Sequence, residues 1–198
     1  MGSGKRPYRM GARAESTVAT GERILDAAEL SFFEGGGEEP TLADVAERSG
    51  VSVQTIMRRF GNRDGLLTAA IARMAAQVGE QRGSAPVGDP VGAVKNLVDH
   101  YEELGDKVVR MLEESARNTA IRQLTRMGFA YHREWCKRVF APTLKALDRP
   151  ERAVRTAQLV AVTDVYVWKL LRRDQGLGRG RTEQAMLGMV EPLTRVDR

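Results

Sequence analysis

The sequence is poor in the residues that build metal and redox sites. Its 198 residues include one cysteine and two histidines, which excludes a disulfide framework and any multi-cysteine zinc site. His100 and His132 lie far apart in the sequence and lack neighbouring ligands. Cys136 is typical of an inert, buried thiol. We therefore expect no metal and no cofactor.

Long apolar runs are also absent. No stretch approaches the roughly 18 residues that span a bilayer, and the best one, residues 159–168, contains Asp164. The basic N-terminus lacks the apolar core of a signal peptide. These absences predict a cytoplasmic protein without a membrane partner.

The charge is unevenly distributed along the chain. A net charge of +5 and a pI of about 9.6 do not by themselves decide for a nucleic-acid partner. Residues 1–82, however, hold eleven basic and eleven acidic side chains, so the whole excess lies beyond them. Any DNA binding by the first part of the chain must depend on local basic clusters.

Apolar residues recur at helical spacing along the chain, and no segment alternates with period two. We therefore predict an all-α protein. In the first half, caps and glycine breaks predict helices over 17–33, 41–49, 52–60 and 63–82. In the second half, helices are expected over 89–104, 106–117, 120–140 and 150–173, with a last helix capped by Thr182.

The clearest break in the chain is the glycine- and proline-containing segment 83–88. It is expected to separate a DNA-binding domain (20–82) from a larger helical domain (89–198). Residues 1–19 are expected to form a flexible arm. The arm could reach an adjacent DNA groove, although the pattern favours a merely solvated terminus. Its basic side chains are Lys5, Arg6, Arg9 and Arg13.

Residues 41–60 have the pattern of two short helices joined by a tight turn. Gly50 supplies the positive φ that such a turn requires. In the second helix, Ile56 and Phe60 lie four residues apart and are expected to pack inward, which directs Gln54 and Arg58 to the opposite face. This arrangement predicts a helix-turn-helix with a polar recognition face.

The polar side chains of this pattern suit the major groove of DNA. Arg58 can donate two hydrogen bonds to guanine, Gln54 can pair with adenine, and Thr55 can meet a thymine methyl group or a phosphate. Neighbouring residues are placed to bind phosphates. The alternative is a helix pair whose arginines are only solvated. The complete predicted interface comprises Thr41, Ser52, Gln54, Thr55, Met57, Arg58, Arg59 and Arg63.

Four segments form a specific pattern: ILDAA at 24–28, TLADVAERSGVS at 41–52, TIMRRF at 55–60 and NRDGLL at 62–67. With these spacings, residues of about 20–75 resemble the N-terminal domain of the tetracycline-repressor (TetR) family of bacterial regulators. The resemblance implies DNA binding. It departs at Met57, where the family usually has a tyrosine that touches the DNA backbone, because methionine offers only apolar contact.

Residues 89–198 resemble the family's larger helical domain only weakly. The resemblance implies a ligand cavity in this domain and a dimer interface made by the last two helices; an ordinary intrachain core is the alternative. Asp164 is expected to bond a ligand or a partner chain, or to emerge at the surface. The candidate pocket residues are Met111, Met127, Phe129, Tyr131, Trp135, Asp164, Tyr166 and Trp168. The candidate interface residues are Val165, Leu170, Ala185, Met186, Met189, Val190 and Leu193.

Together these patterns predict a homodimeric transcriptional regulator, most simply a repressor that leaves a palindromic operator when a small-molecule effector binds. An apolar or aromatic effector would suit the pocket, with a cationic group near Asp164 as one alternative. An activator, a ligand-independent regulator and a protein-interaction module stay open. The sequence holds no nucleophile elbow, metal triad or phosphate loop, so we expect no catalytic residues and no enzyme.

Overall fold

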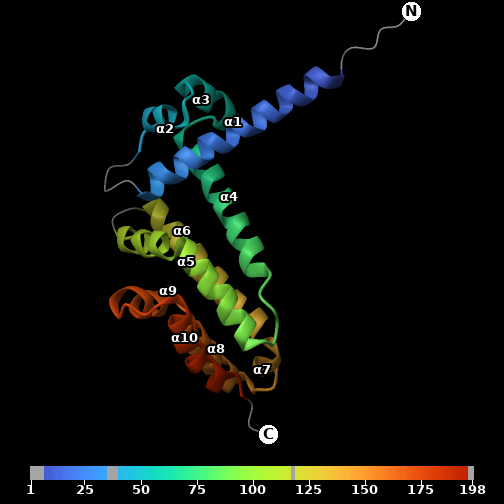
Figure 1. Cartoon of the computed structure of the whole chain (residues 1–198), viewed down its shortest axis with the longest axis vertical. Coiled ribbons are helices and arrows are strands. Elements are labelled where there is room, and N and C mark those ends of the chain that lie inside the picture. Colours follow the sequence, from blue (N-terminus) through green and yellow to red (C-terminus); the bar gives the residue numbers. More distant parts are fainter. Residues whose placement is uncertain (1–6, 35–39, 117–118, 196–198) are drawn as a thin grey trace, which may run out of the picture. The chain divides into compact units, whose positions relative to one another are not determined.

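The computed structural model describes residues 7–34, 40–116 and 119–195, and every regular element within these ranges is helical (Figure 1). The all-α prediction is therefore confirmed. The chain forms two compact units, which divide inside one helix between Ala75 and Ala76. Among the described residues, no helix is long and apolar enough to cross a membrane, and no His, Cys, Asp and Glu side chains cluster as metal ligands.

The first unit contains α1 (Pro7–Glu34), α2 (Leu42–Ser49), α3 (Val53–Phe60) and the first part of α4 (Arg63–Gly83). Helix α1 begins ten residues before the predicted start at residue 17, because the segment that precedes the apolar face is rich in helix-forming residues. The expected flexible arm therefore overlaps α1 from Pro7 onward, whereas Lys5 and Arg6 lie outside the described residues. The buried apolar side chains of this unit are Ile24, Ala27, Ala28, Val45, Ala46, Ile56, Leu66 and Ala70.

An arginine on α4 joins α4 to α1. The guanidinium of Arg73 lies within 2.8 Å of carboxylate oxygens of Glu22, Asp26 and Glu29, which occupy successive turns of α1. The Arg73 side chain is largely buried, so these ion pairs are screened less than exposed ones. The cluster holds α1 and α4 together beneath the short helices.

The second unit begins with the end of α4 and contains α5 (Pro90–Glu114), α6 (Thr119–Val139), α7 (Ala141–Lys145), α8 (Arg149–Val162), α9 (Val165–Lys169), a π-helical turn η1 (Leu170–Asp174) and α10 (Arg179–Thr194). Helix α5 packs against α6, α9 and α10, and α8 packs against α6 and α10. In Figure 1, α8 and α10 lie side by side near the C-terminus. One apolar core fills this unit.

The predicted break at Gly105 is wrong, because α5 runs through it without interruption. Gly105 lies beneath Trp168, which is completely buried and donates from Nε1 to a Glu102 carboxylate oxygen at 3.1 Å. A Cβ atom at position 105 would lie 2.5 Å from the indole ring. The glycine therefore makes room for the tryptophan instead of ending the helix.

The predicted continuous helix over 150–173 is also wrong, because α8 ends at Val162. The Thr163 hydroxyl donates to the Leu159 carbonyl at 2.6 Å, a local bond that competes with helix continuation. Asp164 then caps α9 by accepting from the Tyr166 backbone N–H at 2.9 Å. Asp164 is thus a helix cap and not a carboxylate on the side of an apolar helix.

The last helix begins earlier than predicted. Its first residue is Arg179, and the cap position belongs to Gly178. Thr182, which the sequence suggested as the cap, lies inside α10, where its backbone N–H donates to the Gly178 carbonyl at 2.9 Å. Its side chain is fully buried.

A buried polar network connects α4, α6 and the α8–α9 junction. Arg82 donates from Nη2 to Nδ1 of His132 at 3.0 Å, and Nε2 of His132 lies 3.1 Å from the Thr163 hydroxyl. Because the Thr163 proton is engaged with Leu159, its oxygen accepts, so Nε2 of His132 carries the ring proton. The backbone carbonyl of Arg82 accepts from Trp135 Nε1 at 2.9 Å. This network places the end of α4 in the second unit.

We expect Gly105→Ala to destabilise the protein by about 1–3 kcal/mol, because the new methyl group overpacks the core against Trp168. In an exposed helix interior the same substitution should stabilise by about 0.4–1 kcal/mol. Gly128 on α6 is the matched control, since it is exposed and a Cβ there meets no atom within 4 Å. Urea unfolding of both variants measures the contrast, and equal stabilities would contradict the packing role of Gly105.

The two histidines should make stability depend on pH. Burial, followed by the charge of Arg82, lowers the pKa of both His100 and His132 to about 3. Below the unfolded-state pKa of about 6.5, only the unfolded chain binds these protons, so stability is complete above pH 6.5 and falls toward acid, by up to about 1.4 kcal/mol per pH unit per histidine.

Unfolding free energies of the wild type and His132→Gln, measured between pH 7 and pH 4.5, test this dependence. In the variant, the slope of the unfolding free energy against pH should be smaller by the contribution of about one proton. An unchanged slope in the variant would show that His132 does not titrate on unfolding.

Candidate functional site

The turn between α2 and α3 has the geometry of a helix-turn-helix. Gly50 ends α2 in the left-handed region with φ 67° and ψ 31°, a conformation in which a side chain is disfavoured. Its N–H donates to the Glu47 carbonyl at 3.3 Å, and the next N–H, of Val51, donates to the Ala46 carbonyl at 3.2 Å. The chain then enters α3 after a few residues.

Both short helices carry the predicted N-terminal caps. Thr41 caps α2: its Oγ1 accepts from the Asp44 N–H at 3.3 Å, and its own N–H donates to the Asp44 carboxylate at 2.7 Å. This hydrogen bond from the Thr41 backbone is the largest cause that lowers the pKa of Asp44. Ser52 caps α3 by accepting from the Thr55 N–H at 3.2 Å. These bonds stabilise the two helices, because a helix of eight residues is only marginally stable by itself.

The core side of α3 holds Ile56, which is completely buried, and the opposite side presents Gln54, Met57 and Arg58 to solvent. The side chains of Gln54 and Arg58 make no hydrogen bond or ion pair with any residue that the structure describes. Met57 is half exposed. An exposed guanidinium and an amide on one helix face can donate to and accept from base edges.

The other predicted DNA contacts already have partners inside the first unit. Arg59 donates to the Thr17 carbonyl on α1 at 2.8 Å, and Arg63 donates from Nε to the Pro40 carbonyl at 2.9 Å. The hydroxyls of Ser52 and Thr55 lie 3.0 Å apart and bond to each other. These side chains hold α3 and the start of α4 in place.

The predicted pocket residues do not gather in one place. Met111, Trp135 and Trp168 are buried in the domain core, whereas four others are exposed on α6 and α9: Met127, Phe129, Tyr131 and Tyr166. Asp164, the eighth, caps α9, and burial raises its pKa. Helices α8 and α9 are separate, so Asp164, Tyr166 and Trp168 do not continue the helix that ends at Val162.

The predicted dimer residues are divided between the core and the surface. Val165, Met186 and Val190 are buried in the core of their own unit, and Ala185, Met189 and Leu193 are partly buried. Leu170 is half exposed. Three of the seven side chains therefore already pack within the chain, which was the alternative interpretation of these residues.

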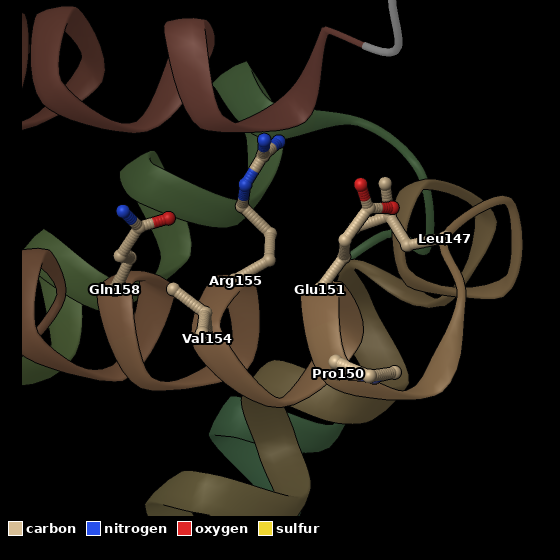
Figure 2. A pocket seen from close by; sticks show the side chains of 6 residues that line it. All are labelled: Leu147, Pro150, Glu151, Val154, Arg155 and Gln158. Carbon is tan, nitrogen blue, oxygen red and sulfur yellow. The ribbon is translucent and has the colours of Figure 1, made fainter.

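The outward faces of α8 and α10 hold small and apolar side chains among polar and charged ones. On α8 the exposed positions include Ala153, Val154, Ala157 and Ala161; on α10 they include Gln184, Gly188 and Pro192. A groove of about 410 Å³ lies at the start of α8 (Figure 2). It is lined by Leu147, Pro150, Glu151, Val154, Arg155 and Gln158.

Sequence reasoning missed Arg73 and Arg82, the two arginines that anchor α4. No motif marks them, because each depends on partners from distant helices. The equal numbers of basic and acidic side chains in residues 1–82 were the one available signal for Arg73, because they left carboxylates within reach of it; they gave no signal for Arg82.

The comparisons with known proteins agree with this geometry. Residues 24–70 match the family described as bacterial regulatory proteins, tetR family. No curated protein is significantly similar to the chain in sequence.

Solved structures share the fold over both units. A transcriptional regulator from Rhodococcus sp. Rha1 is 19% identical with a TM-score of 0.64, and the match covers 87% of this chain and 95% of that one. A TetR transcription regulator from Haloarcula marismortui ATCC 43049 is 16% identical with a TM-score of 0.64, covering 88% and 98%. The match to the tetR family thus covers the helix-turn-helix of the first unit, residues 24–70, and the solved structures share the fold of the chain.

Proposed function

We propose that this protein is a TetR-family transcriptional regulator, and specifically a ligand-responsive repressor that binds a palindromic operator as a homodimer. The observation that carries the proposal is the α3 face, on which Gln54 and Arg58 are exposed and have no described partner, while Arg59 and Arg63 bond to backbone carbonyls of their own unit. Free donors on a fixed helix suit direct readout of bases. One such helix reads only a short half-site, so a two-fold dimer and a palindrome follow.

The outward faces of α8 and α10 are the proposed dimer interface. Their small side chains allow helices of two chains to approach closely, and two helices from each chain would form a four-helix arrangement. This proposal replaces the predicted set of interface residues, because Met186 and Val190 are buried in the chain's own core. Effector binding is assigned to the second unit by analogy with the family.

We expect Arg58→Ala to weaken operator binding by about 1–3 kcal/mol and to relax base preference at one position in each half-site. Selection of random DNA duplexes by the wild type and the variant measures both effects. Arg48→Ala is the matched control, because Arg48 is an exposed arginine on α2 and not on α3. An identical base preference for wild type and Arg58→Ala would exclude Arg58 from base readout.

We expect Val154→Glu to yield monomers, because it would bury an unpaired carboxylate between two copies of α8. Val154 is 60% exposed in one chain, so the fold itself should tolerate the change. Operator affinity should fall sharply, since the two half-sites are no longer bound as one unit. Light scattering measures the mass.

Val91→Glu on α5 provides the control for this test, since Val91 is 52% exposed and lies outside the proposed interface. It should leave the dimer intact. An intact dimer in Val154→Glu as well would place the interface elsewhere on the chain.

A further inference from the structure

The second unit buries a guanidinium without a carboxylate. Arg82 is only 3% exposed, and none of the described aspartates or glutamates forms an ion pair with it. Its Nε–H is buried and has no hydrogen-bond partner among the described residues. A buried charge with an unused donor is costly unless an opposite charge accompanies it.

The two histidines near Arg82 are neutral. His132 accepts from Arg82 at Nδ1 and holds its proton on Nε2, so its ring carries no charge. The pKa of His100 is lowered to about 3 by burial, and then by the charge of Arg82. Neutral histidines cannot balance the positive charge of the guanidinium, and they would not repel an anion that binds beside it.

Aromatic rings provide partial compensation. The Arg82 guanidinium carbon lies 4.3 Å from the centroid of the Trp135 ring and 5.9 Å from that of Tyr131. Such contacts contribute less than a carboxylate that accepts two hydrogen bonds from arginine. Tyr131 is itself exposed on α6. The guanidinium thus lies against two aromatic rings and has no carboxylate partner among the described residues.

We propose that Arg82 binds the carboxylate of an effector whose body is aromatic or aliphatic. The proposal rests on the proposed function, in which the second unit binds a ligand, and it names the chemical class of that ligand. Arginine suits a carboxylate because its planar donors match two carboxylate oxygens. Asp164 has a structural role, since its Oδ1 caps α9 by accepting from the Tyr166 N–H.

Calorimetric titration of the full chain without DNA tests this site. The probes are sodium benzoate, 3-phenylpropanoate and octanoate, each compared with its neutral amide; the first two represent aromatic bodies and the third an aliphatic one. We expect at least one acid to bind and its amide not to bind. Arg82→Met should lower the affinity for that acid by about 10- to 100-fold, which is the contribution of one charged hydrogen bond.

Arg138→Met is the matched control. Arg138 donates to the backbone carbonyls of Arg82 and Ala85 from the exposed side of α6, so its removal disturbs the same segment but leaves the Arg82 guanidinium. Acid binding should persist in this variant. If Arg82→Met does not fold, Arg82→Lys replaces it: weaker acid binding supports the site, and unchanged binding overturns it.

The site is overturned if no acid binds the wild type more tightly than its amide, or if Arg82→Met binds the acid as tightly as the wild type. Operator release by the same acids is measured separately. Binding through Arg82 without release would contradict the ligand-responsive function and leave the site standing. If an acid releases the operator equally well from the wild type and from Arg82→Met, the site is contradicted and the proposed function is not.

Discussion

The left-handed turn at Gly50 is the constraint on which the DNA-binding surface depends. Helices α2 and α3 have eight residues each, too few to be stable in water alone. The turn brings them together, the caps at Thr41 and Ser52 satisfy their free N–H groups, and Ile56 anchors α3 in the core. Arg58 points outward only because Ile56 points inward. Its freedom to read DNA is therefore a consequence of packing.

Arginines perform three different tasks in this protein, and their surroundings decide which. Arg73 is paired with three carboxylates and ties α1 to α4. Arg59 is bonded to the α1 backbone and holds α3 in place. Arg82 is buried beside neutral rings, which leaves its charge unbalanced. The same side chain thus links two helices, positions one helix or is a candidate anion receptor, according to the partners within reach.

Much of the first unit could be predicted because its determinants are local. Caps, glycine turns and a 3.6-residue period lie within a few residues of the helices they define, and Gly50 forms the left-handed turn that the sequence suggested. The second unit was harder to predict. Gly105 resembles a helix breaker in sequence, yet it makes room for Trp168, more than sixty positions away in the printed sequence. Likewise, Thr163 and Asp164 end one helix and begin another inside an apolar run.

The sequence by itself determined the helical class, the helix-turn-helix and the face of α3 that holds Gln54 and Arg58, because periodicity and capping are short-range properties. Only the tertiary structure decided which arginines have partners, that Met186 and Val190 belong to the chain's own core, and that Arg82 is buried without a carboxylate. These facts depend on contacts between residues far apart in the chain. Burial and charge pairing arise from such contacts, and no local pattern encodes them.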